Sequence, residues 1–178
     1  MWWFSENSKR LGYGDNRKIK IGRTHKVEGE LILCKHGLHA SKRIIDALKY
    51  ARGSIIWKVR LGGVIVHATD KSVASERTYI SGGIDVSDVL GKFIRMCALD
   101  VIHLWKAPSE VVEYLKTGKE ALRDAAWDAA WTAAWTAAAG ATARTAAAVA
   151  AWVAAGDAAA GAKQNKRLTR MINRAIRG

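Results

Sequence analysis

Cysteine and proline are scarce in this chain of 178 residues, and each scarcity excludes a class of protein. The two cysteines, Cys34 and Cys97, exclude a domain built on a disulfide framework and predict a reducing cytoplasm as its location. No spacing of cysteine and histidine typical of a zinc site occurs, so we expect neither a metal ion nor a cofactor. The single proline, Pro108, excludes rigid proline-rich linkers.

Negative charge is also in short supply. The chain carries 29 Lys and Arg against 16 Asp and Glu, for a net charge of +13. A hydrophobic content of 49% excludes a wholly disordered chain. The excess of positive charge favours an anionic partner, either a nucleotide or a nucleic acid. The longest uncharged stretch of the alanine-rich part, residues 129–143, is shorter than the roughly 20 apolar residues of a membrane span, so we expect none.

Composition divides the chain into three parts. Residues 121–162 hold 23 alanines among 42 residues, and residues 163–178 hold six basic residues and no acidic one. We therefore predict an α+β domain with basic clusters over residues 1–107, alanine- and tryptophan-rich helices over 108–162, and a basic amphipathic tail helix over 163–178. The predicted fold class is α+β, with a small antiparallel-sheet front domain and a C-terminal alanine-rich helical segment.

The front domain shows both helical and strand periodicity. Apolar spacing predicts a helix over residues 41–51, with Ser41 as its N-cap. The β-branched run over residues 54–61 predicts a strand. Gly62-Gly63 then predicts a two-residue hairpin turn, with a returning strand over residues 64–68.

Helices dominate the pattern after the front domain. A helix is predicted over residues 86–105, and Pro108 ends it and opens a further helix near residues 109–116. Four-residue repeats follow, in which Asp or Thr precedes Ala-Ala-Trp, and their alanine content also predicts a helix. We expect their tryptophans to pack helices together and to join copies of the chain into a homo-oligomer. These residues are Trp127, Trp131, Trp135 and Trp152.

The string from Cys34 to Arg43 predicts an anion site. Its cationic residues fall in the first turn of a predicted helix, where free N–H groups and the helix dipole favour a bound anion. The expected ligand-binding residues are His36, His39, Ser41, Lys42 and Arg43. The alternative is that both histidines are turn residues hydrogen-bonded to the backbone.

Two further basic clusters add candidate phosphate contacts. Residues 9–26 hold seven basic residues and one acid, Asp15, and follow Trp2 and Trp3. Residues 70–77 hold two basic residues, and the alternative for this segment is a helical turn capped by Ser72. The residues predicted to contact the ligand in these clusters are Arg10, Arg17, Arg23, Lys71 and Arg77.

The tail, residues 163–178, has the pattern of an amphipathic helix. Such a helix binds anionic surfaces in some proteins, but it is more often a last helix packed by its apolar face. We favour the packed helix. Its predicted apolar face is Leu168, Met171, Ile172 and Ile176, and its predicted basic face is Lys166, Arg170, Arg174 and Arg177.

Four strings together resemble a family of small bacteriophage-encoded accessory proteins. They are Leu11-Gly-Tyr-Gly-Asp15, Gly37-Leu-His-Ala-Ser41, Asp46-Ala-Leu-Lys-Tyr-Ala51 and the Ala-Ala-Trp repeats, and the resemblance covers most of residues 1–155. It implies a phage protein expressed in the cytoplasm of a bacterial host cell. Small phage accessory proteins often act against host defence.

The second of these strings also looks like part of the nicotinamide-binding half of ADP-ribosyltransferase folds. His39 would match the first member of that family's catalytic set. Glu76 is placed in a loop by the sequence pattern, and no strand-borne glutamate follows it, so no catalytic residue is assigned.

Three functions follow. The favoured one is a phage accessory protein that binds an anionic nucleotide and sequesters a host defence signal, as a means of immune evasion. The alternatives are an inhibitor that binds nucleic acid or a nucleoprotein immune complex, and an ADP-ribosyltransferase-like enzyme.

Overall fold

The protein is described by a computed structural model that covers residues 1–12, 14–104, 106–129, 132 and 161–178. The chain forms two compact units. The first consists of Met1–Val89 together with Asn165–Gly178, and the second of Leu90–Gln164. An antiparallel sheet accompanied by helices confirms the α+β class. The first unit thus ends before the predicted boundary at residue 107 and includes most of the tail.

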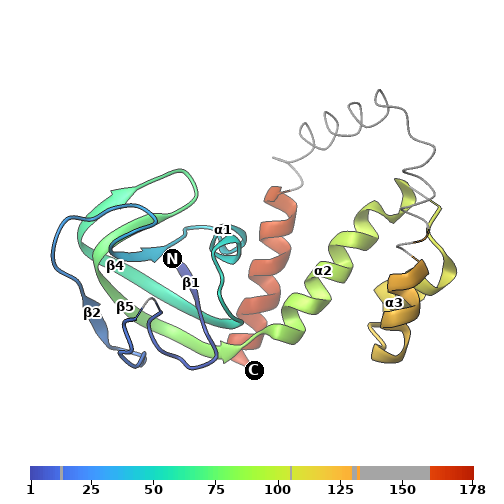
Figure 1. Ribbon diagram of the computed structural model, residues 1–178, viewed down its shortest axis with the longest axis horizontal. Coiled ribbons are helices and arrows are strands. Elements are labelled where there is room, and N and C mark those ends of the chain that lie inside the picture. Colours follow the sequence, from blue (N-terminus) through green and yellow to red (C-terminus); the bar gives the residue numbers. More distant parts are fainter. Residues whose placement is uncertain (13, 105, 130–131, 133–160) are drawn as a thin grey trace. The chain divides into compact units, whose positions relative to one another are not determined.

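A long hairpin forms the centre of the sheet in the first unit (Figure 1). Its strands are β4 (Ile55–His67) and β5 (Ser72–Asp85). The sheet order is β1-β4-β5-β2, and β3 pairs with β5 beside β2. All pairs are antiparallel. The three shorter strands are β1 (Trp2–Ser5), β2 (Thr24–Lys26) and β3 (Leu38–Ala40).

The predicted hairpin turn at Gly62-Gly63 is wrong. β4 runs through both glycines, and the turn lies at its far end, where the Ala68 N–H donates to the Lys71 carbonyl over 2.8 Å. Gly63 has φ +65°, and the strand register shifts between Gly62 and Ile65. A bulge needs the same positive φ as a tight hairpin turn, so the glycine pair fits both structures. The alternative of a helical turn capped by Ser72 is also wrong, because Ser72 begins β5.

The sheet closes on itself through the N-terminal strand. Trp2 and Ser41 exchange backbone hydrogen bonds of 2.8 and 3.0 Å, so β1 is joined to β4 on one side and to the end of β3 on the other. The enclosed face carries an apolar core. Its buried members are Leu11, Ile19, Leu38, Ala40, Ile55, Trp57, Val59 and Tyr79.

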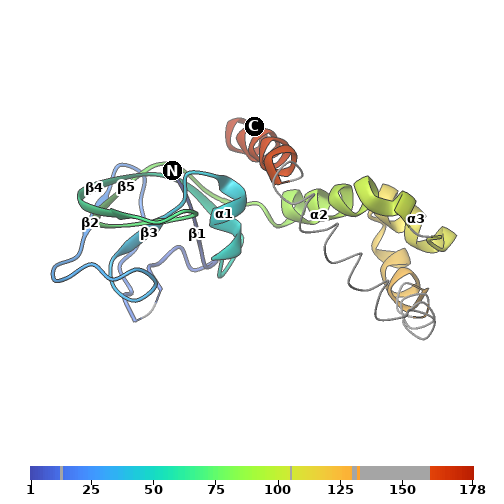
Figure 2. The same ribbon diagram turned by 90° about the horizontal axis from the view of Figure 1, so that it is seen from above.

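Helix α1 (Ile44–Lys49) follows β3 and lies beside β1 (Figure 2). Its N-cap is Arg43 in extended conformation, without a side-chain hydrogen bond. The prediction that Ser41 caps this helix is therefore wrong, because the backbone of Ser41 is used to close the sheet. Sheet closure outweighs the local capping preference, which is worth only about 1 kcal/mol.

The C-terminal helix covers residues 161–177, and its part from Asn165 belongs to the first unit. Leu168 and Ile172 are fully buried, which confirms the packed amphipathic helix. The backbone N–H of Ile45 donates to Asn165 Oδ1 over 3.3 Å and joins this helix to α1. The basic face is exposed as predicted, at Lys166, Arg170, Arg174 and Arg177.

The second unit is helical in its described residues. The predicted helix over residues 86–105 is divided into α2 (Ser87–Val101), part of which lies in the first unit, and a 3-10 turn, η1 (Ile102–Leu104). Pro108 precedes α3 (Ser109–Thr117) as predicted, and a 3-10 turn, η2 (Glu120–Leu122), follows. Residues 123–129 are helical.

The tryptophan stripe is described at one position only. Trp127 is 69% exposed. Trp131, Trp135 and Trp152 lie outside the described residues, so their role in helix packing stays a prediction. Across the described part of the chain, no helix has the length and apolar character needed to cross a membrane.

Candidate functional site

A cavity of about 420 Å³ lies in the first unit. Residues from β1, β3, α1 and the connecting loops line it, together with Arg77 of β5. Its aromatic residues include Trp2, Trp3 and Tyr50. Two carboxylates line it, those of Glu6 and Asp15. The cations outnumber them and are Arg10, Lys35, Arg52, Lys71 and Arg77.

Arg77 is the buried cation of this cavity, with a relative exposure of 2%. Its Nε and Nη2 donate to the Tyr79 hydroxyl over 3.1 and 3.0 Å, and its Nη1 donates to the His39 carbonyl over 2.6 Å. The guanidinium carbon lies 3.7 Å from the centre of the Trp3 ring. Because Arg77 and Tyr79 are two residues apart on β5, their side chains share the inner face of the sheet.

No carboxylate balances this buried charge within ion-pair distance in the described residues. Burial lowers the pKa of Arg77, yet a guanidinium keeps its proton at neutral pH. A guanidinium has five N–H groups, and three of those on Arg77 are used by the hydrogen bonds above. A buried cation with free donors in a cavity is the chemistry of an anion site.

Tyr79 is the centre of a buried polar cluster. It is fully buried, and its hydroxyl lies 3.1 Å from Nδ1 of His25. Because this oxygen accepts two N–H groups of Arg77, its own proton points to His25 Nδ1, which therefore acts as acceptor. The proton of His25 is then on Nε2, which is buried and has no hydrogen-bond partner among the described residues. The rings of Trp57 and His25 meet that of Tyr79 edge-on at centroid distances of 5.5 and 5.3 Å.

Burial and the nearby charges of Arg17, Arg23 and Arg77 lower the pKa of His25. An unfolded histidine takes up its proton near pH 6.5, whereas folded His25 takes it up at lower pH. The folded state thus binds fewer protons in this window, and the free energy of unfolding should decrease as the pH falls below about 6.5.

Urea unfolding at several pH values measures this dependence. In the variant His25→Phe the loss of stability between neutral and mildly acidic pH should be smaller than in the parent. His67→Phe is the control, because His67 lies at the end of the hairpin with its Nδ1 2.8 Å from the Ser72 hydroxyl. An unchanged slope in His25→Phe would contradict the assignment of a neutral buried His25.

The two histidines predicted as ligand-binding residues line the cavity, and each is bound to the backbone. His39 Nε2 accepts the N–H of Cys34 over 3.0 Å, and burial lowers the pKa of His39. His36 Nε2 donates to the Glu28 carbonyl over 2.7 Å. Both therefore bond to the backbone, as the alternative interpretation expects, but His39 lies on strand β3 and not in a turn.

Lys71 is a partly exposed cation of the cavity wall. Its Nζ lies 4.0 Å from the centre of the Tyr50 ring. The neighbouring side chains of Cys34 and Tyr50 raise the pKa of Lys71, so it stays charged at neutral pH. The Tyr50 hydroxyl donates to Asp70 over 2.7 Å. Lys71 thus adds another positive charge to the cavity lining that contains Arg77.

Six of the predicted ligand-binding residues line the cavity, and they are Arg10, His36, His39, Ser41, Lys71 and Arg77. Four others do not. Arg17 forms a two-nitrogen pair with Asp15, with a shortest distance of 2.6 Å. Arg43 pairs with Asp46 at 3.4 Å, and α1, with six residues, is too short for an anion site at its N-terminus. Lys42 is exposed.

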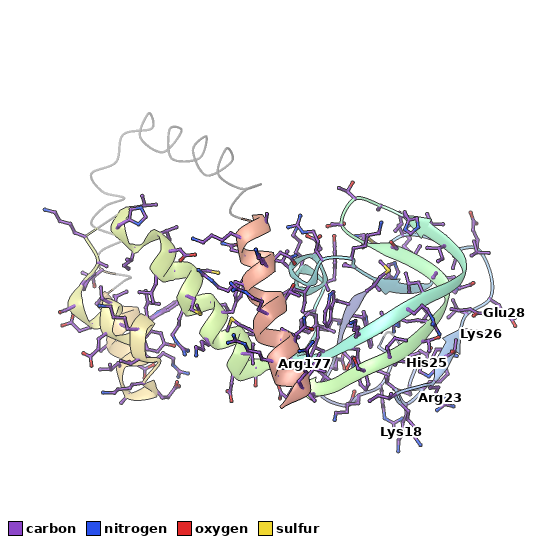
Figure 3. The ribbon with its side chains drawn as sticks, turned by 180° about the vertical axis from the view of Figure 1, so that it is seen from behind. Lys18, Arg23, His25, Lys26, Glu28 and Arg177 are labelled. Carbon is purple, nitrogen blue, oxygen red and sulfur yellow. The ribbon has the colours of Figure 1, made fainter. Side chains whose placement is uncertain are left out.

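Arg23, the fourth, lies away from the cavity. Figure 3 shows Lys18, Arg23 and Lys26 gathered along β2 and the turn before it. These cations are exposed to solvent, as expected of charged side chains on a protein surface. The 9–26 cluster therefore divides, with Arg10 at the cavity and the rest outside it.

Sequence reasoning missed Tyr79 and did not connect Trp3 with Arg77. Trp3 was considered only as an aromatic beside the 9–26 cluster, whereas the structure stacks it on Arg77, whose Nε and Nη2 donate to the Tyr79 hydroxyl. The signal for Tyr79 is the spacing Arg77-Thr78-Tyr79, since alternate residues of a strand share a face. The sequence interpretation ended the returning strand at residue 68, so it did not place Arg77 and Tyr79 on one strand.

Glu76 lies on strand β5, so its expected loop context is wrong. Its side chain is on the outer face, where Oε1 pairs with Lys26 Nζ at 2.7 Å. Glu76 is not among the residues that line the cavity. The carboxylate that an ADP-ribosyltransferase would need is therefore separated from His39 by the sheet.

Among the residues that the structure describes, no three His, Cys, Asp or Glu side chains come together in a way that could hold a metal ion. Comparisons with family models, with curated proteins and with solved structures find no match to this chain.

Proposed function

We propose that this protein binds an anionic nucleotide in the cavity at Arg77. The observation that carries the proposal is the burial of the Arg77 guanidinium at the cavity wall with no ion-pair partner among the described residues. Such a charge costs several kcal/mol to bury unless an opposite charge approaches it. A bound anion supplies that charge.

The size and lining of the cavity support a nucleotide as the anion. A volume of about 420 Å³ is within the range of small-molecule sites, about 300–1,000 Å³. The exposed Lys35 and the partly exposed Lys71 provide further phosphate contacts, and the aromatic rings provide surfaces for a base. The cavity therefore offers both kinds of contact that a nucleotide needs.

The proposed role is sequestration. A bacteriophage accessory protein with this cavity would remove a host defence signalling nucleotide from the cytoplasm and so allow immune evasion. Binding alone suffices for this role, and it needs no catalytic residue. Homo-oligomer formation through the alanine-rich helices belongs to the same proposal. The position of Glu76 on the far face disfavours the enzymatic alternative.

Arg77→Met should weaken nucleotide binding about ten- to a hundredfold, because a charge-assisted contact is worth about 1.5–3 kcal/mol. Isothermal titration with a panel of cyclic and linear mono- and dinucleotides measures the change. Arg60→Met is the matched control, since Arg60 is exposed on the neighbouring strand β4 and does not line the cavity.

Folding of Arg77→Met is checked by its circular dichroism and melting curve. Methionine fills the space of the arginine stem, but it leaves the His39 carbonyl and the Tyr79 hydroxyl without their donors, so a lower melting temperature is expected and binding is compared well below it. The proposal fails if no nucleotide binds the parent protein, or if a folded Arg77→Met binds as tightly as the parent.

A further inference from the structure

The charge balance around Arg77 restricts the group that binds there. Resting on the proposed function, we infer that the ligand places a singly charged oxyanion with two terminal oxygens on Arg77, a phosphodiester or a carboxylate. A phosphate monoester does not fit the balance of the site. The cavity therefore selects cyclic or internally linked nucleotides over nucleoside monophosphates.

Among the described residues that line the cavity, Arg77 is the one buried cation, and the others are partly or fully exposed to solvent. The carboxylate of Asp15 acts on Arg77 electrostatically, but it is already paired with Arg17. The other titratable groups that face Arg77 are neutral near pH 7, because burial lowers the pKa of both histidines and raises that of the tyrosine. They are His25 on β2, His39 on β3 and Tyr79 on β5.

The hydrogen-bond donors of Arg77 lead to the same kind of ligand. Within the described residues, three of the five N–H groups of Arg77 are used, one on each nitrogen, which leaves one on Nη1 and one on Nη2 for a ligand. Two terminal oxygens with one shared charge, as in a phosphodiester or a carboxylate, satisfy both donors and balance the charge. The stacking of the guanidinium on Trp3 leaves its edge, and not that face, for this contact.

A phosphate monoester carries a charge of about −1.5 to −2 at neutral pH, because its second pKa is about 6. At Arg77 it would place up to one negative charge beyond what the buried guanidinium balances, because the other cations of the cavity lining are partly or fully exposed to solvent. Such a charge is costly to desolvate. The same group becomes a monoanion when the pH falls below its second pKa, so its affinity should rise on acidification.

Three adenosine ligands test the inference. They are 3′,5′-cyclic AMP with a phosphodiester, adenosine 5′-carboxylate with a carboxylate, and AMP with a monoester. Titration calorimetry at about pH 7.5 and about pH 5.5 brackets the second ionisation of AMP. We expect the tighter of the two monoanions to bind at least about tenfold more strongly than AMP at the higher pH, and this gap to narrow at the lower pH.

Comparison of the two monoanions shows whether the site prefers a phosphodiester or a carboxylate, because the ligand that binds more tightly carries the preferred group. In Arg77→Met the preference over AMP should disappear, whereas Arg60→Met should keep it. AMP that binds as tightly as both monoanions at about pH 7.5, or a gap that does not change with pH, overturns the inference and leaves nucleotide binding intact. Absence of binding by all three ligands, and by the wider panel, overturns the proposed function as well.

Discussion

Replacing Gly82 with alanine is expected to lower the free energy of unfolding of the first unit by about 3–5 kcal/mol. Gly82 has φ +105°, a conformation that side chains rarely adopt. An added Cβ would also meet the Ile56 carbonyl oxygen and lie 3.0 Å from Trp57 Cα. Both contacts are with backbone atoms of the paired strand, which cannot rotate away. The clash falls where the register of β4 and β5 shifts, at the bulge beside Trp57.

Gly22→Ala is the control for this prediction. Gly22 has φ +81° but no atom within 4 Å of the added Cβ, so only the conformational cost of about 1–2 kcal/mol applies. Urea unfolding of both variants separates the steric cost from the conformational one. Equal losses in the two variants would show that the bulge adjusts to the methyl group.

Tyr79→Phe is expected to be the second most disruptive conservative change, with a loss of about 2–4 kcal/mol of stability. The variant keeps the ring and its edge-on contacts with Trp57 and His25, and it removes a single oxygen. That oxygen accepts two N–H groups of Arg77 and bonds to His25. Two N–H groups of a buried guanidinium then lose their acceptor, and an unsatisfied charged donor costs more than a neutral one.

Tyr50→Phe is the matched control, measured by the same chemical unfolding. Tyr50 is 47% exposed, and its hydroxyl bonds to the exposed Asp70, so water can replace the lost contact. We expect a change within about 0.5 kcal/mol. The cluster around Tyr79 would not be a determinant of stability if both variants unfolded at the same urea concentration.

Local sequence patterns were sufficient for the α+β class, for the packed tail helix and for the helix that follows Pro108. These features depend on neighbours within a few residues, such as the spacing of Leu168 and Ile172. The path of the sheet was not predictable in this way. Gly62-Gly63 meets the local requirements of a turn, and its place within β4 depends on pairing with β5 over the whole length of the hairpin.

The cavity was predicted only in part, because some of its contacts join residues that are far apart in the chain. The sequence singled out the string around His39 and the pair Lys71 and Arg77, which the structure brings together. The sequence analysis attributed the anion site to a helix N-terminus, whereas the structure has the buried guanidinium of Arg77 on strand β5. The partners of Arg77 are Trp3 and Tyr79, and Trp3 is far from it in the chain, so no local spacing connects them.

The first unit is discontinuous, and this affects the order of events during synthesis. Its helix from Asn165 onward, with the fully buried Leu168 and Ile172, is made after the whole of Leu90–Gln164. Until then α1 lacks its contact with this helix at Asn165, and contacts of such long sequence separation form slowly. Premature termination within the second unit would therefore also leave the cavity-bearing unit incomplete and exposed to proteolysis.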